Sequence, residues 1–146
     1  MSDPMRIRLI AESDLAACGR IYSDAFRRPP YSEEPDPEWA AKMLAGPLEK
    51  DPENCWGIED DCRLVGFAFC TVFGGLRATI QEFAISPAAQ GSGYGTALMA
   101  HLMEDFTQRG VQSVDLVANR EAPAFGFYRR FGFYEPRRYR LMTKRL

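Results

Sequence analysis

Residues 80–99 read IQEFAISPAAQGSGYGTALM, in which an apolar strand runs through a glycine-rich turn into an amphipathic helix. Gly91, Gly93 and Gly95 stand at alternate positions, so the backbone can adopt conformations that a Cβ atom would forbid, and a ligand can approach its N–H groups closely. The first amides of the helix have no partner within it and carry the positive end of its dipole. The turn is therefore predicted to bind an anionic group such as a phosphate.

Two common phosphate-binding motifs do not fit this turn. A Walker loop is excluded because the chain has no G-x-x-x-x-G-K-[ST] string and no lysine follows the glycines. A dinucleotide fingerprint fits poorly, since the glycines are spaced G-x-G-x-G and only about fifty residues follow them. That length is too short for the rest of a Rossmann sheet.

The periodicity of the remaining chain predicts alternating strands and helices. Before the turn, strands are expected at residues 5–9, 55–59, 63–73 and 78–85, and helices at residues 13–26, capped by Ser13, and 37–48, capped by Asp36. After it, we expect a helix at residues 95–109, a strand at 113–118, a last helix at 119–131 and a final strand within the tail, 137–144. The strands on either side of the helix at 95–109 should be parallel, as in a crossover unit.

Length and composition fit one globular domain over residues 1–146, with 46% hydrophobic and 26% charged residues. Residues 1–6 lack the apolar stretch of a signal peptide, and no apolar run is long enough to span a membrane. A cytoplasmic protein without a membrane partner is expected.

The four cysteines and the single histidine do not indicate a metal site. Cys18, Cys55, Cys62 and Cys70 form no C-x-x-C pair, and His101 falls inside a predicted helix. Reduced, partly buried thiols are the simpler interpretation, and neither a metal ion nor a Cys–His nucleophile is expected.

Charge is distributed unevenly along the chain, although the net charge is only −2. Residues 32–61 hold ten acidic and two basic side chains, a balance of −8, whereas residues 120–146 hold eight basic and two acidic ones, a balance of +6. This asymmetry fits two solvated faces, or an acidic side that attracts a cationic substrate and a basic side that holds an anionic cofactor. A nucleic-acid partner is not expected, because the chain is net acidic and has no recognised binding motif.

Two motifs in the expected order resemble one known family. Residues 90–95 match the Q/R-x-x-G-x-G/A motif of the GNAT superfamily of acetyl-coenzyme A dependent N-acetyltransferases, and Asn119 with residues 127–128 and 132–133 resembles its N…F-Y-x-x-x-G-F segment. The resemblance covers nearly the whole chain. It implies an α/β (α+β) fold with a mixed, mostly antiparallel central sheet, flanking helices, and fourth and fifth strands that splay apart.

The resemblance also implies acetyl-CoA as the co-substrate. Backbone amides of residues 91–96 would hold its pyrophosphate, and the strand edge at residues 83–85 would pair with its pantetheine arm. Asn119 would contact the pantetheine, with a helix cap as its alternative role. The implied cofactor-binding residues are Phe83, Ala84, Ile85, Gln90, Gly91, Ser92, Gly93, Tyr94, Gly95, Thr96, Asn119 and Tyr128.

Tyr128 matches the tyrosine that protonates the departing thiolate in relatives. A phenol is a suitable donor to a thiolate, whose conjugate acid has a pKa of about 8.5. The alternative is a core tyrosine in an aromatic cluster with residues 125, 127, 131 and 133. The spacing from Asn119 to Tyr128 is longer than is usual in the family, whereas the spacing from Tyr128 to Gly132 is intact.

The catalytic base is less clearly marked. Two positions at which relatives carry a carboxylate correspond to Thr79 and Gln81, neither of which is a base at neutral pH. The neighbouring Glu82 is the candidate, but side chains alternate along a strand, so it should face away from Gln81 unless a bulge shifts the phase.

The loop between the first two helices would supply substrate-binding residues, namely Tyr31, Glu33 and Glu34, together with Glu82. Direct transfer needs no acyl-cysteine, and a strand amide near Ala84 would stabilise the charge that develops on the carbonyl oxygen.

The sequence thus predicts an N-acetyltransferase that moves an acetyl group from acetyl-CoA to a primary amine of a cationic small molecule, in a ternary complex. Two alternatives stay open: acetylation of a protein N-terminus or lysine, and a non-catalytic sensor of acyl-CoA. Relatives are often dimers, so a homodimer is also expected.

Overall fold

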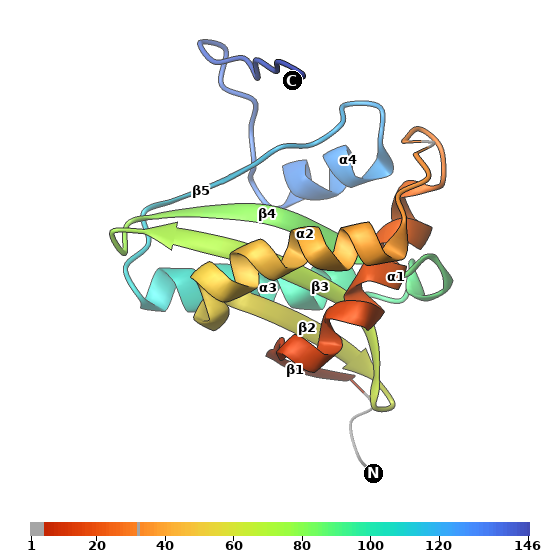
Figure 1. Cartoon of the computed structure of the whole chain (residues 1–146). Coiled ribbons are helices and arrows are strands. Elements are labelled where there is room, and N and C mark those ends of the chain that lie inside the picture. Colours follow the sequence, from red (N-terminus) through yellow and green to blue (C-terminus); the bar gives the residue numbers. More distant parts are fainter. Residues whose placement is uncertain (1–4, 32) are drawn as a thin grey trace.

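The computed structural model describes residues 5–31 and 33–146. Its five strands form one sheet in the order β1-β2-β3-β4-β5 (Figure 1). The strands are β1 (Met5–Leu9), β2 (Cys55–Asp60), β3 (Arg63–Phe73), β4 (Arg77–Ile85) and β5 (Ser113–Leu116). The first four pair antiparallel in sequence order, and β5 pairs parallel to β4, which confirms the mixed, mostly antiparallel sheet.

Helices cover both faces of this sheet. The α-helices are α1 (Leu15–Phe26), α2 (Pro37–Lys50), α3 (Tyr94–Gln108) and α4 (Pro123–Arg130), and short 3-10 turns are η1 (Glu12–Asp14), η2 (Pro52–Asn54) and η3 (Pro87–Ala89). Side chains of β3 point alternately to the two faces of the sheet. Phe67 and Phe69 pack with α1 and α2 on one face, whereas Ala68 and Cys70 pack with α3 on the other. α4 adds Phe127 to the core on the α3 side.

α1 and α2 approach each other closely at Gly19. A Cβ atom there would lie 2.3 Å from the carbonyl oxygen of Pro37, so no other residue fits this crossing. Asp36 caps α2 as expected, because its Oδ1 accepts a hydrogen bond from the N–H of Glu38 at 3.1 Å. The two helices therefore form one fixed layer over the sheet.

The start of α1 differs from the prediction. Ser13 does not cap it; η1 precedes the helix, and the carboxylate of Asp14 accepts the N–H of Ala11 at 2.7 Å. Asp14 also binds Arg8 through two hydrogen bonds of 2.7 and 3.0 Å. A carboxylate held by a guanidinium of β1 is a stronger acceptor than a serine hydroxyl, so the turn forms around Asp14.

Three predictions after the glycine turn were wrong in detail. β5 ends at Leu116 rather than 118, and α4 begins at Pro123 rather than 119. Within the described residues, the segment 137–144 forms no strand, and its Tyr139, Leu141 and Met142 are exposed. An alternating pattern becomes a strand only beside a hydrogen-bonding neighbour, and this segment leads away from the sheet after α4 (Figure 1).

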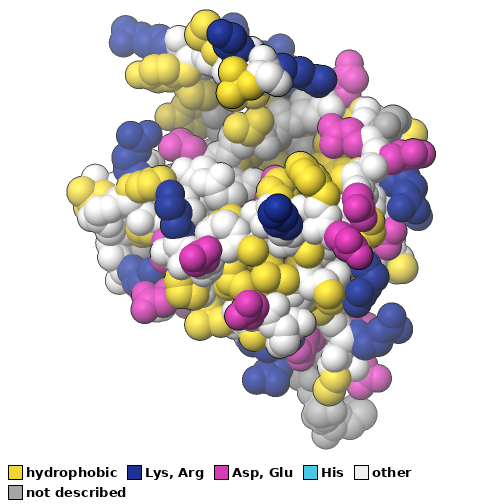
Figure 2. Space-filling view, viewed as in Figure 1, with side chains coloured by type: hydrophobic (Ala, Val, Ile, Leu, Met, Phe, Trp, Pro, Cys, Tyr) yellow, Lys and Arg dark blue, Asp and Glu magenta, His cyan; other side chains and the backbone are white. Residues whose placement is uncertain are grey.

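The uneven charge is visible on the molecule. On the face drawn in Figure 2, Lys and Arg side chains gather at the top, on the C-terminal segment, and Asp and Glu side chains lie at the right, near the segment that joins α1 and α2. Within residues 5–31 and 33–146, no helix combines the length and apolar character needed to cross a membrane. Residues 1–4, part of the start predicted to lack a signal segment, lie outside the described residues.

Candidate active site

The site begins where β4 and β5 separate. The two strands pair only from Arg77 opposite Ser113 to Ile80 opposite Leu116. β4 then continues through residues 81–85 without a β5 partner, so the backbone groups on that side of the strand are open to another hydrogen-bonding chain. This is the splay that the sequence predicted.

The glycine turn lies directly beyond the open end of β4. Gly91 and Gly93 have φ values of 83° and 87°, in the left-handed region that side chains disfavour. The first hydrogen bond of α3 runs from the N–H of Ala97 to the carbonyl of Gly93 and is 3.0 Å long. The amides of residues 94–96 therefore have no partner within the helix. Gln90 closes the turn, since its Nε2 donates to the carbonyl of Ile85 at 3.1 Å.

Side chains around this turn leave its backbone accessible. Residues 91–93 and Thr96 are exposed. The phenol of Tyr94 is directed to the carboxylate of Asp60, whose hydrogen bond raises the pKa of Tyr94. A Cβ atom at Gly95 would make only ordinary contacts, 3.6 Å from Ile85 and Phe127. The amides in the first turn of α3 can therefore hold an anion.

A β-bulge decides where Glu82 points. Phe69 pairs with Glu82 but Cys70 pairs with Ile80, which leaves Gln81 as an extra residue on β4. Both Gln81 and Glu82 therefore lie on the α1–α2 side of the sheet, and Gln81 donates from Nε2 to Thr71 Oγ1 at 3.0 Å. Simple alternation would have separated the two side chains.

Most of the predicted catalytic and substrate-binding residues meet in one cavity of about 260 Å³ between β4, the end of β5, α4 and the loop after α1. Tyr31, Glu33, Glu82, Phe83, Asn119 and Tyr128 all line it. Glu34 is exposed and does not line it. Ala84 and Ile85 do not line it either: Ala84 packs under α1 and α2, and Ile85 packs on the α3 side.

The loop after α1 is tied in place by aromatic and backbone contacts. The ring of Phe26 lies 4.5 Å from that of Tyr22 and 4.7 Å from that of Tyr31. The N–H of Glu33 donates to the carbonyl of Phe26 at 3.0 Å, and the hydroxyl of Ser23 donates to the carbonyl of Pro35 at 2.5 Å. These contacts direct Tyr31 and Glu33 toward the cavity.

Two titratable groups in this cavity have shifted pKa values. Burial, and then the negative charge of Glu33, raise the pKa of Glu82 to about 7. Burial also raises the pKa of Tyr128, with smaller contributions from Tyr31 and Glu82. Near neutral pH, Glu82 can therefore accept a proton while Tyr128 keeps the proton that it can donate.

Comparison with known proteins identifies the family of this chain. The sequence model described as "Acetyltransferase (GNAT) family" matches residues 15–133. The chain belongs to the GNAT acetyltransferase family. An uncharacterized N-acetyltransferase ycf52 of Porphyra purpurea is 37% identical over 75 residues, which are 51% of this chain and 42% of that protein. The chain thus matches less than half the length of such curated relatives.

Solved GNAT structures share the fold over most of the chain. The ribosomal-protein-S18-alanine N-acetyltransferase of Escherichia coli superposes with a TM-score of 0.74 at 27% identity, covering 90% of this chain and 79% of that one. The PaiA N-acetyltransferase of Thermoplasma acidophilum, solved with coenzyme A, gives 0.75 at 18% identity, covering 92% and 91%. The arrangement of strands and helices is therefore that of a GNAT domain.

Asn119 lies both in the turn before α4 and in the cavity wall. Its Oδ1 accepts a hydrogen bond from the N–H of Glu121 at 2.8 Å, which orders the turn before α4, although the N-cap of the helix is Ala122. The residue also lines the cavity, and its Nδ2 has no partner among the described residues. The same carboxamide can hold the turn and donate to a ligand.

Tyr128 likewise belongs to an aromatic cluster and to the cavity. Its ring lies 5.5 Å from Phe127, 6.0 Å from Phe133 and 6.2 Å from Phe83. These neighbours fix the ring, which is what a proton donor requires. Packing and catalysis are therefore compatible at this residue.

Tyr22 and Phe26 also line the cavity, although neither is among the site residues predicted from the sequence. Their spacing of four residues at the end of α1, just before the aromatic Tyr31, was the available signal.

Burial raises the pKa of the Cys70 thiol, so a thiolate nucleophile is disfavoured there. The described residues contain no group of three or more side chains that could hold a metal ion.

Proposed function

We propose that this GNAT protein is an N-acetyltransferase that moves an acetyl group from acetyl-CoA to a primary amine of a small molecule. The observation that carries the proposal is that Glu82 and Tyr128 line the same cavity at the open edge of β4, the strand that leads into the glycine turn. One can take a proton from the amine, and the other can give one to the departing thiolate.

The residues present fit coenzyme A. The free amides of residues 94–96 and the dipole of α3 suit a pyrophosphate, and the unpaired stretch of β4 suits a pantetheine arm, which carries its own amide groups. A structural neighbour that was solved with coenzyme A supports this assignment. Acetyl-CoA supplies a thioester carbonyl that an unprotonated amine can attack directly.

The chain's own groups then manage protons and charge. Glu82 takes a proton from the bound ammonium, and the amine nitrogen forms the new C–N bond as the C–S bond breaks. Tyr128 gives its proton to the sulfur and regains one as the new amide nitrogen loses its second proton, and Glu82 releases the proton that it took to solvent. A backbone N–H on the open stretch of β4, near Ala84, is proposed to stabilise the carbonyl oxygen. Glu33, at the cavity wall, adds negative charge that attracts the ammonium.

A protein N-terminus is the second candidate acceptor. The Escherichia coli neighbour is named for acetylating the alanine of a ribosomal protein, and it is 27% identical to this chain. A non-catalytic acyl-CoA sensor is the third, since Thr79 and Gln81 are not bases. An enzyme is favoured over the sensor because Glu82, beside these two positions, lines one cavity with Tyr128.

Two assays separate these functions. Acetyl-CoA should raise the melting temperature of the protein, whereas ATP and NADH should leave it unchanged. No shift with acetyl-CoA would remove the cofactor assignment. Release of the CoA thiol should then be measured over a panel of small amines and of peptides with free N-termini. Turnover with small amines supports the proposal, turnover with peptides alone favours the second candidate, and binding without turnover identifies a sensor.

A further inference from the structure

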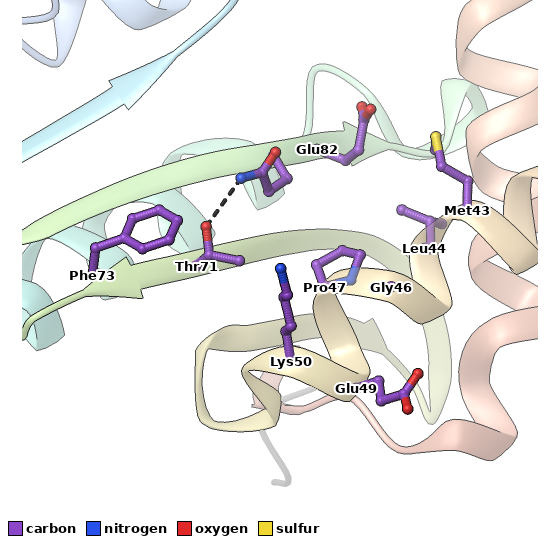
Figure 3. A pocket seen from close by; sticks show the side chains of 10 residues that line it. Met43, Leu44, Gly46, Pro47, Glu49, Lys50, Thr71, Phe73 and Glu82 are labelled. Carbon is purple, nitrogen blue, oxygen red and sulfur yellow. Dashed lines mark hydrogen bonds between the residues drawn. The ribbon is translucent and has the colours of Figure 1, made fainter.

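A second and larger cavity, of about 820 Å³, lies between the C-terminal half of α2 and strands β3 and β4 (Figure 3). Its walls are largely apolar: Met43, Leu44 and Pro47 come from α2, and Phe73 comes from β3. Its size falls in the range that holds small organic ligands. None of the motifs found in the sequence accounts for it.

This cavity meets the catalytic cavity at two residues. Gln81 and Glu82 line both of them. The bulge is the reason, because it turns both side chains to the α1–α2 side, where the larger cavity lies. A molecule in the larger cavity can therefore present an amine to the carboxylate of Glu82, at the boundary with the space that Tyr128 lines.

The far part of the larger cavity carries a cation. Lys50, at the end of α2, points toward Thr71 and the strands, whereas the neighbouring Glu49 points away from them (Figure 3). Among the described residues Lys50 has no ion pair or hydrogen bond, and the carboxylate of the following residue, Asp51, accepts the N–H of Val72 at 2.8 Å. The cavity is apolar, with the carboxylate of Glu82 where it joins the catalytic site and the ammonium of Lys50 on its wall. It therefore complements a ligand that has a cation at one end and an anion at the other.

We propose that this larger cavity is the acceptor pocket, and that the acceptor is a primary amine with an apolar body and an anionic group at the end remote from the amine. The inference rests on the proposed function and specifies its substrate class. The amine binds at Glu82, the apolar body lies along Met43, Pro47 and Phe73, and the anion faces Lys50. A polyamine, which carries a second cation in place of the anion, fits this pocket poorly.

Three acceptors with the same six-carbon chain test the charge requirement. They are 6-aminohexanoate, hexylamine and 1,6-diaminohexane, whose far ends are an anion, a methyl group and a cation. We expect kcat/KM to be highest for 6-aminohexanoate and lowest for the diamine. Lys50→Ala should lower the ratio of kcat/KM for 6-aminohexanoate over hexylamine by about fivefold, the effect of one exposed ion pair. Lys42→Ala, an exposed lysine of α2 that does not line the cavity, should leave the ratio unchanged.

Gly46 allows the cavity itself to be filled. It lines the cavity within α2, and a Cβ atom there would meet no atom within 4 Å. Gly46→Leu therefore adds a side chain to empty space and replaces a poor helix former by a good one. We expect the variant to fold, to bind acetyl-CoA as before, and to raise KM for 6-aminohexanoate by at least about tenfold. Lys42→Leu is the matched control, because it adds the same side chain outside the cavity.

A binding readout that needs no turnover separates the two hypotheses. Hexanoate, which has the carboxylate but no amine, should raise the melting temperature of the wild-type protein and not that of Gly46→Leu. Turnover with the amines that is insensitive to both Gly46→Leu and Lys50→Ala would overturn the acceptor pocket while leaving the acetyltransferase in place. Hexanoate binding without turnover of any amine would instead overturn the proposed function. If Gly46→Leu does not fold, the ratio measured with Lys50→Ala decides the question.

Discussion

Glu82 owes its chemistry to a single extra residue in β4. The bulge at Gln81 turns its carboxylate to the α1–α2 side, and burial there raises its pKa from 4.5 to about 7. The folded chain therefore holds this proton more tightly than the unfolded chain. Between these two pKa values the unfolded chain ionises while the folded chain still holds the proton, so this group lowers stability as pH rises through that window.

Glu82→Gln should remove the base. At neutral pH we expect kcat to fall by about a hundredfold, the usual contribution of a positioned base. In the wild-type enzyme kcat/KM should rise as Glu82 ionises near pH 7, and this limb should disappear in the variant. An unchanged pH profile with full activity would assign the base to another group.

The same variant tests the pKa without turnover. Glutamine carries no charge, so Glu82→Gln should gain melting temperature relative to the wild-type protein at pH 8 and gain less at pH 5. Asp24→Asn, an exposed carboxylate of α1 outside both cavities, is the control and should show no such trend. A difference that is independent of pH would mean that Glu82 is already ionised at pH 5.

Tyr128→Phe should separate proton donation from packing. The phenyl ring keeps the contacts with Phe83 and Phe133, while the hydroxyl is lost. We expect kcat to fall by about a hundredfold and the Kd for acetyl-CoA to change by less than about twofold. Loss of binding and of stability, with kcat retained for the bound enzyme, would show that Tyr128 serves the core alone.

At the scale of elements, the glycine turn is the part proposed to bind the pyrophosphate of acetyl-CoA. Gly93→Ala places a Cβ atom at a φ of 87° and narrows the approach to the α3 amides. We expect the Kd for acetyl-CoA to rise by about tenfold, together with a modest loss of stability. The check is calorimetric titration.

Gly75→Ala is the control for backbone strain. Gly75 has a φ of 72° in the turn between β3 and β4, and a Cβ atom there also meets nothing within 4 Å. Its substitution should destabilise the fold to a similar extent and leave the Kd for acetyl-CoA unchanged. Equal effects of the two substitutions on binding would contradict the assignment of the glycine turn.

The elements show what a sequence reveals by itself. Period-two alternation located β1, the Val- and Phe-rich run before two glycines located β3, and the glycine motif located the start of α3, because these signals are local. The bulge at Gln81 depends on the register between β4 and β3, which no local pattern records. The missing strand at residues 137–144 has the same cause, since a strand needs a neighbour as well as a pattern.

At the scale of the molecule, the features shared with the GNAT family can be separated from those particular to this chain. The splay of β4 and β5, the glycine turn and Tyr128 were predictable from two motifs. The larger cavity was not, because it arises where side chains of α2, β3 and the bulge come together from separate parts of the sequence. If the larger cavity is the acceptor pocket, as proposed, specificity depends on the part of the site that the motifs do not describe.

The central claim is that acetyl-CoA bound at the open edge of β4 gives its acetyl group to an amine held at Glu82. The most direct test measures CoA thiol and N-acetylated amine together, by thiol titration and mass spectrometry, in one reaction of the purified protein with acetyl-CoA and 6-aminohexanoate. We predict equal amounts of the two products, with both rates reduced in Glu82→Gln and Tyr128→Phe. Thiol release without acetylated amine, or equal rates in the two variants and the wild-type protein, would contradict it.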